Sequence, residues 1–195
     1  MSILELIGVV VGLIYLYLEY HANIWLWAAN IVMPAIYIFV YHDAGFYADM
    51  GINIYYLIIS IYGWYKWRFV KTKRVEKEVP ITHTPIKMIL PLIVVTIAVF
   101  VAICYVLINF TDSTVPYGDS FTTAVSIVGM WMLARKFVEQ WLVWLVVDVV
   151  CVALYVYKGL YPTAGLYALY SAIAVVGYVK WLKLMKQQNE TDCIA

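Results

Sequence analysis

A single acidic residue stands near the centre of an otherwise apolar stretch, Val138–Tyr157. That residue, Asp148, would cost roughly 2.5–3.5 kcal/mol to insert at the centre of a membrane helix, so it is a candidate functional residue. Residues three, four or seven positions apart share one face of a helix. Trp141, Trp144 and Tyr155 share the face of Asp148. An anion bordered by aromatic rings suits an organic cation.

Two further apolar stretches, Asn23–Tyr41 and Phe46–Trp67, also carry asparagine and aromatic residues along one helical face. Together the three stretches hold the candidate substrate-binding residues Trp27, Asn30, Tyr37, Asn53, Tyr56, Trp141, Trp144, Asp148 and Tyr155. Asparagine and aspartate supply directional hydrogen bonds, and tryptophan and tyrosine supply flat aromatic faces. Such a pocket suits a flat, polar, cationic ring compound.

Each candidate also has a purely structural interpretation. Asparagine often joins membrane helices through hydrogen bonds worth about 0.6 kcal/mol on average. Asp148 would then pair with a neighbouring helix, and tryptophan and tyrosine would pack or lie at the membrane interface. The recurrence of the pattern at matching places in the chain favours a binding site.

The composition indicates a polytopic membrane protein. Of its 195 residues, 65% are hydrophobic and 13% are charged, whereas a soluble domain has about 25% charged residues. The net charge of +1 gives no reason to expect a nucleic-acid partner. The sequence lacks a nucleotide-binding loop, a metal-spaced histidine cluster and a nucleophile elbow. We therefore expect no enzymatic activity, no metal and no cofactor.

Seven apolar stretches approach the roughly 20 residues that a membrane helix needs. Their expected bounds are Ile3–Tyr20, Asn23–Tyr41, Phe46–Trp67, Met88–Phe110, Ser120–Leu133, Val138–Tyr157 and Leu160–Met185. Basic residues gather in Arg68–Lys87, at Arg135-Lys136 and in the C-terminal tail, all on one side of seven spans. The positive-inside rule therefore predicts an external N-terminus and a cytoplasmic C-terminus.

Similar residues recur in the first and last thirds of the chain. The run Gly63–Trp67 matches Gly177–Trp181 at an offset of 114 residues. In the preceding stretches we expect an offset of 117 to 118, which pairs Trp27 with Trp144 and Asn30 with Asp148. The prediction is one all-α transporter domain over residues 1–195, with three-helix repeats at 3–67 and 120–185 and a linker helix at 88–110. One linker helix makes the repeats parallel, with a site at their interface.

The motif Tyr62-Gly63-Trp64-Tyr65-x-Trp67, the run RKFVEQWLVW at Arg135–Trp144 and the three-helix repeat resemble the PnuC vitamin transporters over nearly the whole chain. The resemblance implies a seven-helix, 3+1+3 fold like that of the SWEET sugar transporters, and a homotrimer in the lipid bilayer of the cell (inner) membrane. It also implies facilitated diffusion of an unphosphorylated vitamin, which a cytoplasmic vitamin kinase then traps. Family members carry nicotinamide riboside, thiamine (the PnuT branch) or riboflavin.

Two positions depart from the nicotinamide riboside pattern that the resemblance implies. Asn53 replaces a glutamine and Asp148 replaces an asparagine. A carboxylate suits either vitamin cation, and the aminopyrimidine of thiamine also offers it hydrogen-bond donors, whereas riboflavin is neutral. We expect a transporter for a cationic vitamin, with thiamine preferred and nicotinamide riboside as the alternative. Proton-coupled transport and a non-transporting vitamin-binding scaffold or sensor stay open.

Overall fold

The protein is all-α throughout the part of the chain that the structure describes. This structure, a computed structural model, describes the backbone of residues 3–44, 47–69, 79–111 and 113–194. The helices are α1 (Ile3–Tyr20), α2 (Leu26–Ala44), α3 (Tyr47–Phe69), α4 (Ile86–Phe110), α5 (Pro116–Ala134), α6 (Gln140–Tyr157) and α7 (Tyr161–Ile194). Within the described residues, α4, α6 and most of α7 are long and apolar enough to cross a membrane. The predicted all-α class with seven helices is confirmed.

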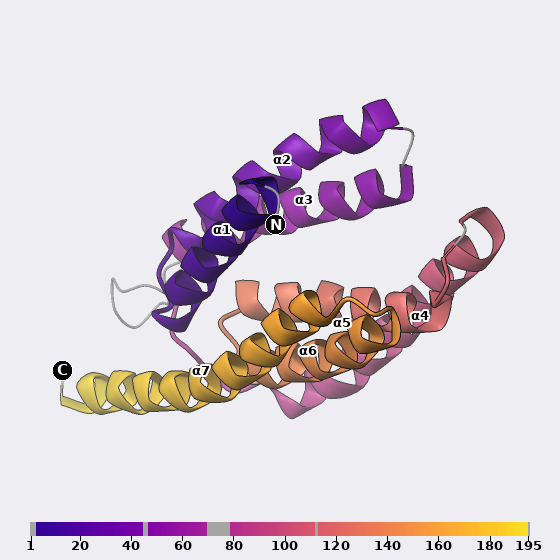
Figure 1. Cartoon of the computed structure of the whole chain (residues 1–195). Helices are drawn as coiled ribbons and strands as arrows, with labels where there is room; N and C mark the ends of the chain where they lie inside the picture. The colour runs from indigo at the N-terminus through magenta and orange to yellow at the C-terminus, as the bar shows by residue number, and fades with distance from the viewer. Residues whose placement is uncertain (1–2, 45–46, 70–78, 112, 195) are drawn as a thin grey trace. The chain divides into compact units, whose positions relative to one another are not determined.

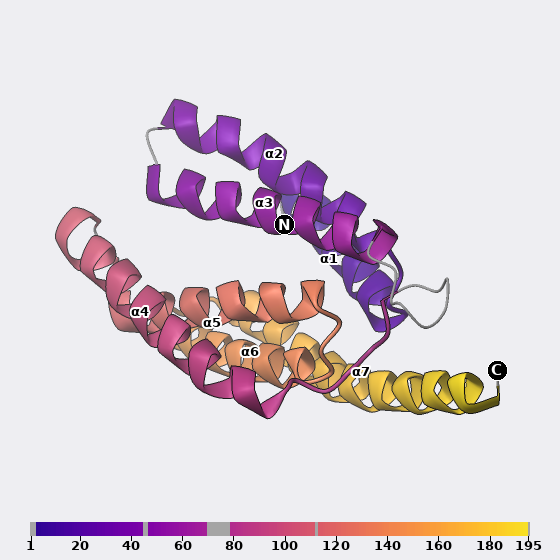
Figure 2. The ribbon, with the colours of Figure 1, turned by 180° about the vertical axis from the view of Figure 1, so that it is seen from behind.

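The helices belong to two compact units, Met1–Pro80 and Ile81–Ala195. In the first unit, α2 and α3 run side by side and α1 contacts α2 (Figure 1). In the second unit, α6 packs against both α5 and α7, and α4 packs against α5 (Figure 2). The helix predicted as a linker, α4, is therefore part of the second unit. Residues 70–78 of the predicted basic loop lie outside the described residues.

The α1–α2 turn and the α5–α6 turn have the same backbone structure, at positions 114 residues apart. Each contains one non-glycine residue in the left-handed conformation, Ala22 with φ of 50° and Lys136 with φ of 56°. The amide-to-carbonyl hydrogen bonds are Ala22 to Glu19 (2.9 Å), Asn23 to Leu18 (2.9 Å), Lys136 to Leu133 (2.9 Å) and Phe137 to Met132 (3.1 Å). This pattern is the Schellman motif, which ends a helix and satisfies its last carbonyl groups.

In the first unit, a tryptophan fills the space left by a glycine. The Trp27 side chain of α2 is fully buried, and a β-carbon on Gly63 of α3 would overlap its indole ring. The same indole meets the Trp67 ring edge to face, with 5.5 Å between the centroids. The glycine thus allows α2 and α3 to approach closely around one aromatic side chain.

The second unit contains the same arrangement between α6 and α7. Trp141 is 1% exposed, and a β-carbon on Gly177 would lie 2.7 Å from its Cε2 atom. The Trp141 and Trp181 rings meet edge to face at 5.9 Å. Each unit therefore joins a helix pair through a Gly-x-x-x-Trp motif and a tryptophan of the preceding helix.

These matching contacts correct the predicted register between the two halves. Trp27 and Trp141 are 114 residues apart, like the two left-handed residues and the two glycines. The predicted offset of 117 to 118, which paired Trp27 with Trp144, is therefore wrong. α2 and α6 both begin four residues after the left-handed residue, so the spacing of 114 residues also holds for the starts of these two helices. At an offset of 114, Asp148 corresponds to Pro34 and not to Asn30.

The starts of α2 and α5 differ from the predicted ones for local reasons. α2 begins at Leu26 and not at Asn23, because the Asn23 side-chain oxygen accepts a hydrogen bond from the Trp25 amide (3.0 Å) and holds a turn. α5 begins earlier than predicted, at Pro116 and not at Ser120. Proline is favoured in the first helical turn because its missing amide hydrogen has no partner to lose there.

Residues 81–85, which we call the strap, are tied to the start of α6. The Thr82 carbonyl oxygen accepts a hydrogen bond from the Val138 amide at 3.0 Å. One carboxylate oxygen of Glu139 accepts hydrogen bonds from the amide and the hydroxyl of Thr84, at 2.7 Å each. Because Val138 pairs with the strap, α6 begins two residues later than predicted.

Candidate substrate-binding site

Asp148 lies in the middle of α6 with 7% of its surface exposed. Among the described residues, Cys151 of α6 and Tyr167 and Tyr170 of α7 lie near enough to interact electrostatically with it. Within the described residues, no hydrogen bond or ion pair satisfies its carboxylate. A buried charge that lacks a protein partner is costly. A cationic ligand beside this carboxylate would offset that cost.

Three tyrosines form an aromatic cluster next to Asp148. Tyr155 stacks on Tyr167, with 5.1 Å between the centroids and 26° between the planes. Tyr167 meets Tyr170 edge to face at 5.6 Å. Tyr155 belongs to the predicted set, but Tyr167 and Tyr170 do not. One signal in the sequence pointed to Tyr170, because it lies 114 residues after Tyr56, a predicted site residue.

The two tryptophans of α6, Trp141 and Trp144, pack against glycines of neighbouring helices and not against this tyrosine cluster. Trp141 packs against Gly177, and its buried ring leaves no open face for a ligand. Trp144 is half-buried and packs toward α5, where a β-carbon on Gly129 would lie 3.5 Å from its Cε2 atom. Within the described residues, neither indole N–H has a hydrogen-bond partner. These contacts assign helix packing to Trp141 and a place between α5 and α6 to Trp144.

The first unit has a polar cluster of its own. Tyr15 of α1 lies near Glu19 of the same helix, Asn30 of α2 and Tyr56 of α3. Glu19 is 1% exposed. Asn30 and Tyr56 were predicted, whereas Tyr15 and Glu19 were not, although their spacing of four residues places them on one helical face. Polar side chains of all three helices therefore meet inside the first unit.

The remaining predicted residues occupy different environments. Trp27 is buried against Gly63, in the same way as Trp141 is buried against Gly177. Tyr37 of α2 is 40% exposed. Asn53 is half-buried on α3, three residues before Tyr56. The structure thus groups part of the predicted set within each unit, and a single cavity lined by both units stays a prediction.

Comparisons with known proteins agree on one family. A family model described as "Nicotinamide mononucleotide transporter" matches residues 2–183. The "Nicotinamide riboside transporter PnuC" of Escherichia coli (strain K12) is 23% identical, with 97% of this chain and 89% of the relative covered. The "Riboflavin/roseoflavin transporter RibM" of Streptomyces davaonensis is 26% identical, covering 91% and 83%. The crystal structure of the Vitamin B3 transporter PnuC shares this fold, with a TM-score of 0.68, 22% identity, and coverage of 92% and 80%.

Proposed function

Since the chain belongs to the nicotinamide mononucleotide transporter family, it is a PnuC-family vitamin transporter and a membrane protein, and we propose that it carries nicotinamide riboside. The relatives from Escherichia coli and Streptomyces davaonensis are named for nicotinamide riboside and for riboflavin, respectively. The preference for thiamine that we drew from Asp148 gains no support from them. The alternative from the sequence, nicotinamide riboside, is therefore the better choice. Membership of a transporter family is consistent with the expectation that the chain is not an enzyme.

The surroundings of Asp148 are the observation that carries this proposal. Nicotinamide riboside contains a pyridinium ring, which is flat and positively charged. Beside Asp148, that ring would meet a carboxylate and the aromatic faces of Tyr155 and Tyr167 together. Neutral riboflavin would leave the buried carboxylate uncompensated.

The proposed architecture is the 3+1+3 arrangement of the SWEET-like fold. The matching Schellman turns and the matching Trp–Gly contacts support α1–α3 and α5–α7 as two repeats, with α4 as the linker. In repeat transporters the substrate site lies at the interface between the repeats. We place Asn30, Asn53 and Tyr56 on one wall of that site, and Asp148 and Tyr155 on the other.

The proposed cellular setting follows from charge and from the resemblance. The basic residues at Arg135-Lys136 and in the C-terminal part of α7 support a cytoplasmic C-terminus and an external N-terminus. We place the protein in the inner membrane as a homotrimer. Facilitated diffusion only equilibrates the vitamin, so accumulation would require a cytoplasmic kinase that phosphorylates it.

Uptake into proteoliposomes tests the proposal. Labelled nicotinamide riboside should equilibrate across vesicles that contain the protein and stay out of empty vesicles. Unlabelled thiamine should compete less well than unlabelled nicotinamide riboside, and riboflavin least. Dissipating a proton gradient should leave the final level unchanged. Faster uptake of thiamine than of nicotinamide riboside would favour thiamine as the substrate. A final level that depends on the proton gradient would indicate proton-coupled transport. Binding without uptake would indicate a scaffold or sensor.

A further inference from the structure

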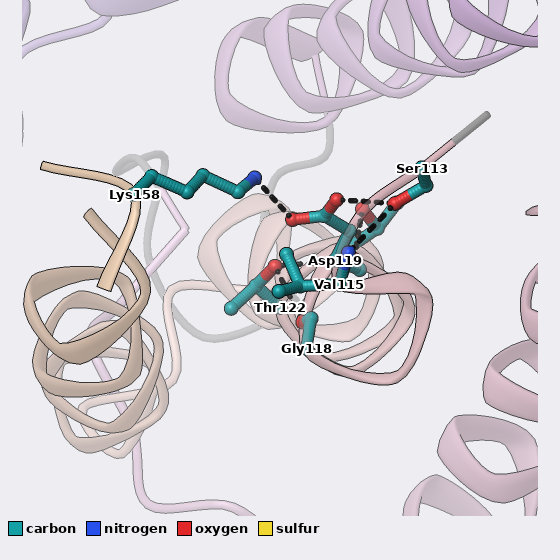
Figure 3. Close-up of polar contacts among 7 residues, drawn as sticks. Ser113, Val115, Gly118, Asp119, Thr122 and Lys158 are labelled. Atoms are coloured by element: carbon teal, nitrogen blue, oxygen red, sulfur yellow. Dashed lines mark hydrogen bonds and ion pairs between the residues drawn. The ribbon is translucent and has the colours of Figure 1, made fainter. Parts of the chain in front are cut away.

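An ion pair joins the first turn of α5 to the turn that follows α6. The Lys158 ammonium lies 3.2 Å from one carboxylate oxygen of Asp119. The other carboxylate oxygen accepts a hydrogen bond from the Ser113 hydroxyl at 2.9 Å. Figure 3 shows Lys158 extending from its turn to the carboxylate, with Ser113 on the opposite side. Both charged side chains are partly exposed, 28% for Lys158 and 35% for Asp119.

This ion pair lies next to the tyrosine cluster of the candidate site. The Lys158 ammonium is 6.0 Å from the centroid of the Tyr155 ring, and Tyr155 stacks on Tyr167. Along α6, Asp148 and Lys158 are ten residues apart, which is about 15 Å of helix. The ion pair therefore stands at the end of α6, and Tyr155 of the tyrosine cluster lies between it and Asp148 along the helix.

The thiol of Cys151 lies within electrostatic range of both Asp148 and the ion pair. It interacts electrostatically with Asp148 and also with Asp119 and Lys158. Cys151 is three residues after Asp148 and four before Tyr155, so the three side chains share one face of α6. This face of α6 thus runs from Asp148 toward the end of the helix where Lys158 follows.

We propose that the Asp119–Lys158 ion pair is a gate at the outer end of the substrate path, and that it must separate before a cationic vitamin reaches Asp148. This inference rests on the proposed function. A partly exposed ion pair is weak, so it can break repeatedly at a low energetic cost. When Lys158 moves away, the Asp119 carboxylate loses its partner and offers a first contact to the incoming cation. The alternative is a purely structural ion pair that stays closed and holds α5 against the α6–α7 turn.

Cys151 provides a natural reporter that distinguishes a gate from a permanent tie. It is a free cysteine with 8% exposure, so it reacts slowly while the path is closed. The other two cysteines, Cys104 and Cys193, would be replaced by serine. A membrane-impermeant maleimide would then be applied to intact cells and, separately, to inside-out vesicles, and the labelling rate of Cys151 measured.

Lys158→Gln should raise the labelling rate of Cys151 in intact cells by about two- to fivefold, the range that loss of a partly exposed ion pair supports. The charge-swapped double variant, Asp119→Lys with Lys158→Asp, should return the rate toward that of the parent. Lys183→Gln removes an exposed lysine elsewhere on α7 and should change nothing. Added nicotinamide riboside should slow the labelling in the parent and in Lys158→Gln.

An unchanged rate in Lys158→Gln, or acceleration only in inside-out vesicles, would overturn the outer gate. Absence of labelling in every variant from both sides would also overturn it. Labelling does not require transport, so the two proposals fail separately. Intact uptake with unchanged labelling contradicts only the gate, and accelerated labelling without uptake contradicts only the proposed function.

Discussion

The indole of Trp141 lies so close to Gly177 that a β-carbon on this glycine would stand 2.7 Å from its Cε2 atom. Real β-carbon contacts are not this short, so any larger residue must push α6 and α7 apart or displace the ring. The interior around it is closely packed and resists such shifts. The same constraint holds between Trp27 and Gly63 in the first unit. Both glycines therefore determine how closely their helix pairs pack.

Gly177→Ala should destabilise the protein by about 1–3 kcal/mol, the usual cost of overpacking. Gly165→Ala is the matched control on the same helix, because a β-carbon there meets nothing within 4 Å. Thermal unfolding of both variants in one detergent would measure the difference. An equal loss at the two positions, or no loss at Gly177, would contradict the assigned packing.

This contact also explains why the register between the two halves was mispredicted. Trp141 and Trp144 are both aromatic and only three residues apart, so residue type alone matched Trp27 to the wrong one. The contact with Gly177 lies on a different helix, and only the fold shows which indole fills it. The number of helices was predictable, because each apolar stretch is about as long as a membrane helix. Their starts depend on turn hydrogen bonds that hydropathy does not report.

Ala22→Gly should stabilise the first unit. A left-handed conformation costs a non-glycine residue about 1–2 kcal/mol, and Ala22 adopts one with φ of 50°. Glycine loses more chain entropy on folding, so we expect a net gain of about 0.5–1 kcal/mol in the free energy of unfolding. The control Ala28→Gly lies inside α2 and should destabilise by about 1 kcal/mol. A lower melting temperature for Ala22→Gly than for the parent would refute the expected relief of strain.

The strap should loosen in acid because of Glu139. Burial alone would raise the pKa of the Glu139 carboxyl, but hydrogen bonds from His83 (2.6 Å) and Thr84 outweigh it and hold the pKa below its usual 4.5. A carboxyl with a lowered folded pKa contributes stability that is complete above the unfolded pKa. That contribution is lost as the pH falls through the folded pKa. The contacts between the strap and the start of α6 should therefore be stable at neutral pH and become less stable below about pH 4.5.

Hydrogen exchange would measure this loosening at the Thr84 and Val138 amides, which form the strap contacts. Their protection, corrected for the intrinsic pH dependence of exchange, should fall in acid. At neutral pH, Glu139→Ala should lower it by about tenfold. Glu190→Ala removes an exposed glutamate of α7 and serves as the control. Protection that is independent of both pH and Glu139 would show that the backbone pairing alone holds the strap.

The candidate site was predictable within one helix and not between helices. Asp148 and Tyr155 share a face of α6 because they are seven residues apart. Tyr167 joins them only because α7 packs against α6, and this neighbour relationship has no signal in the period of either stretch. In the first unit, Tyr15 meets Asn30 for the same reason. The spacing of residues along one helix therefore predicts which of them share a face, whereas the residues that pack against that face become known only from the fold.

Asp148→Asn should weaken binding of nicotinamide riboside by about tenfold or more, because a hydrogen-bonding or charge contact to an ionised group contributes about 1.5–3 kcal/mol. The asparagine is close in size and uncharged, so the variant should fold at least as well in a membrane. Calorimetry on the purified protein would measure the affinity, and Asp148→Glu, which keeps the charge, should recover part of it. The reduced dihydropyridine form of the nucleoside is a neutral ligand of nearly the same shape and serves as the matched control. If Asp148→Asn weakens the neutral and the cationic form equally, the carboxylate does not act through the charge of the ring.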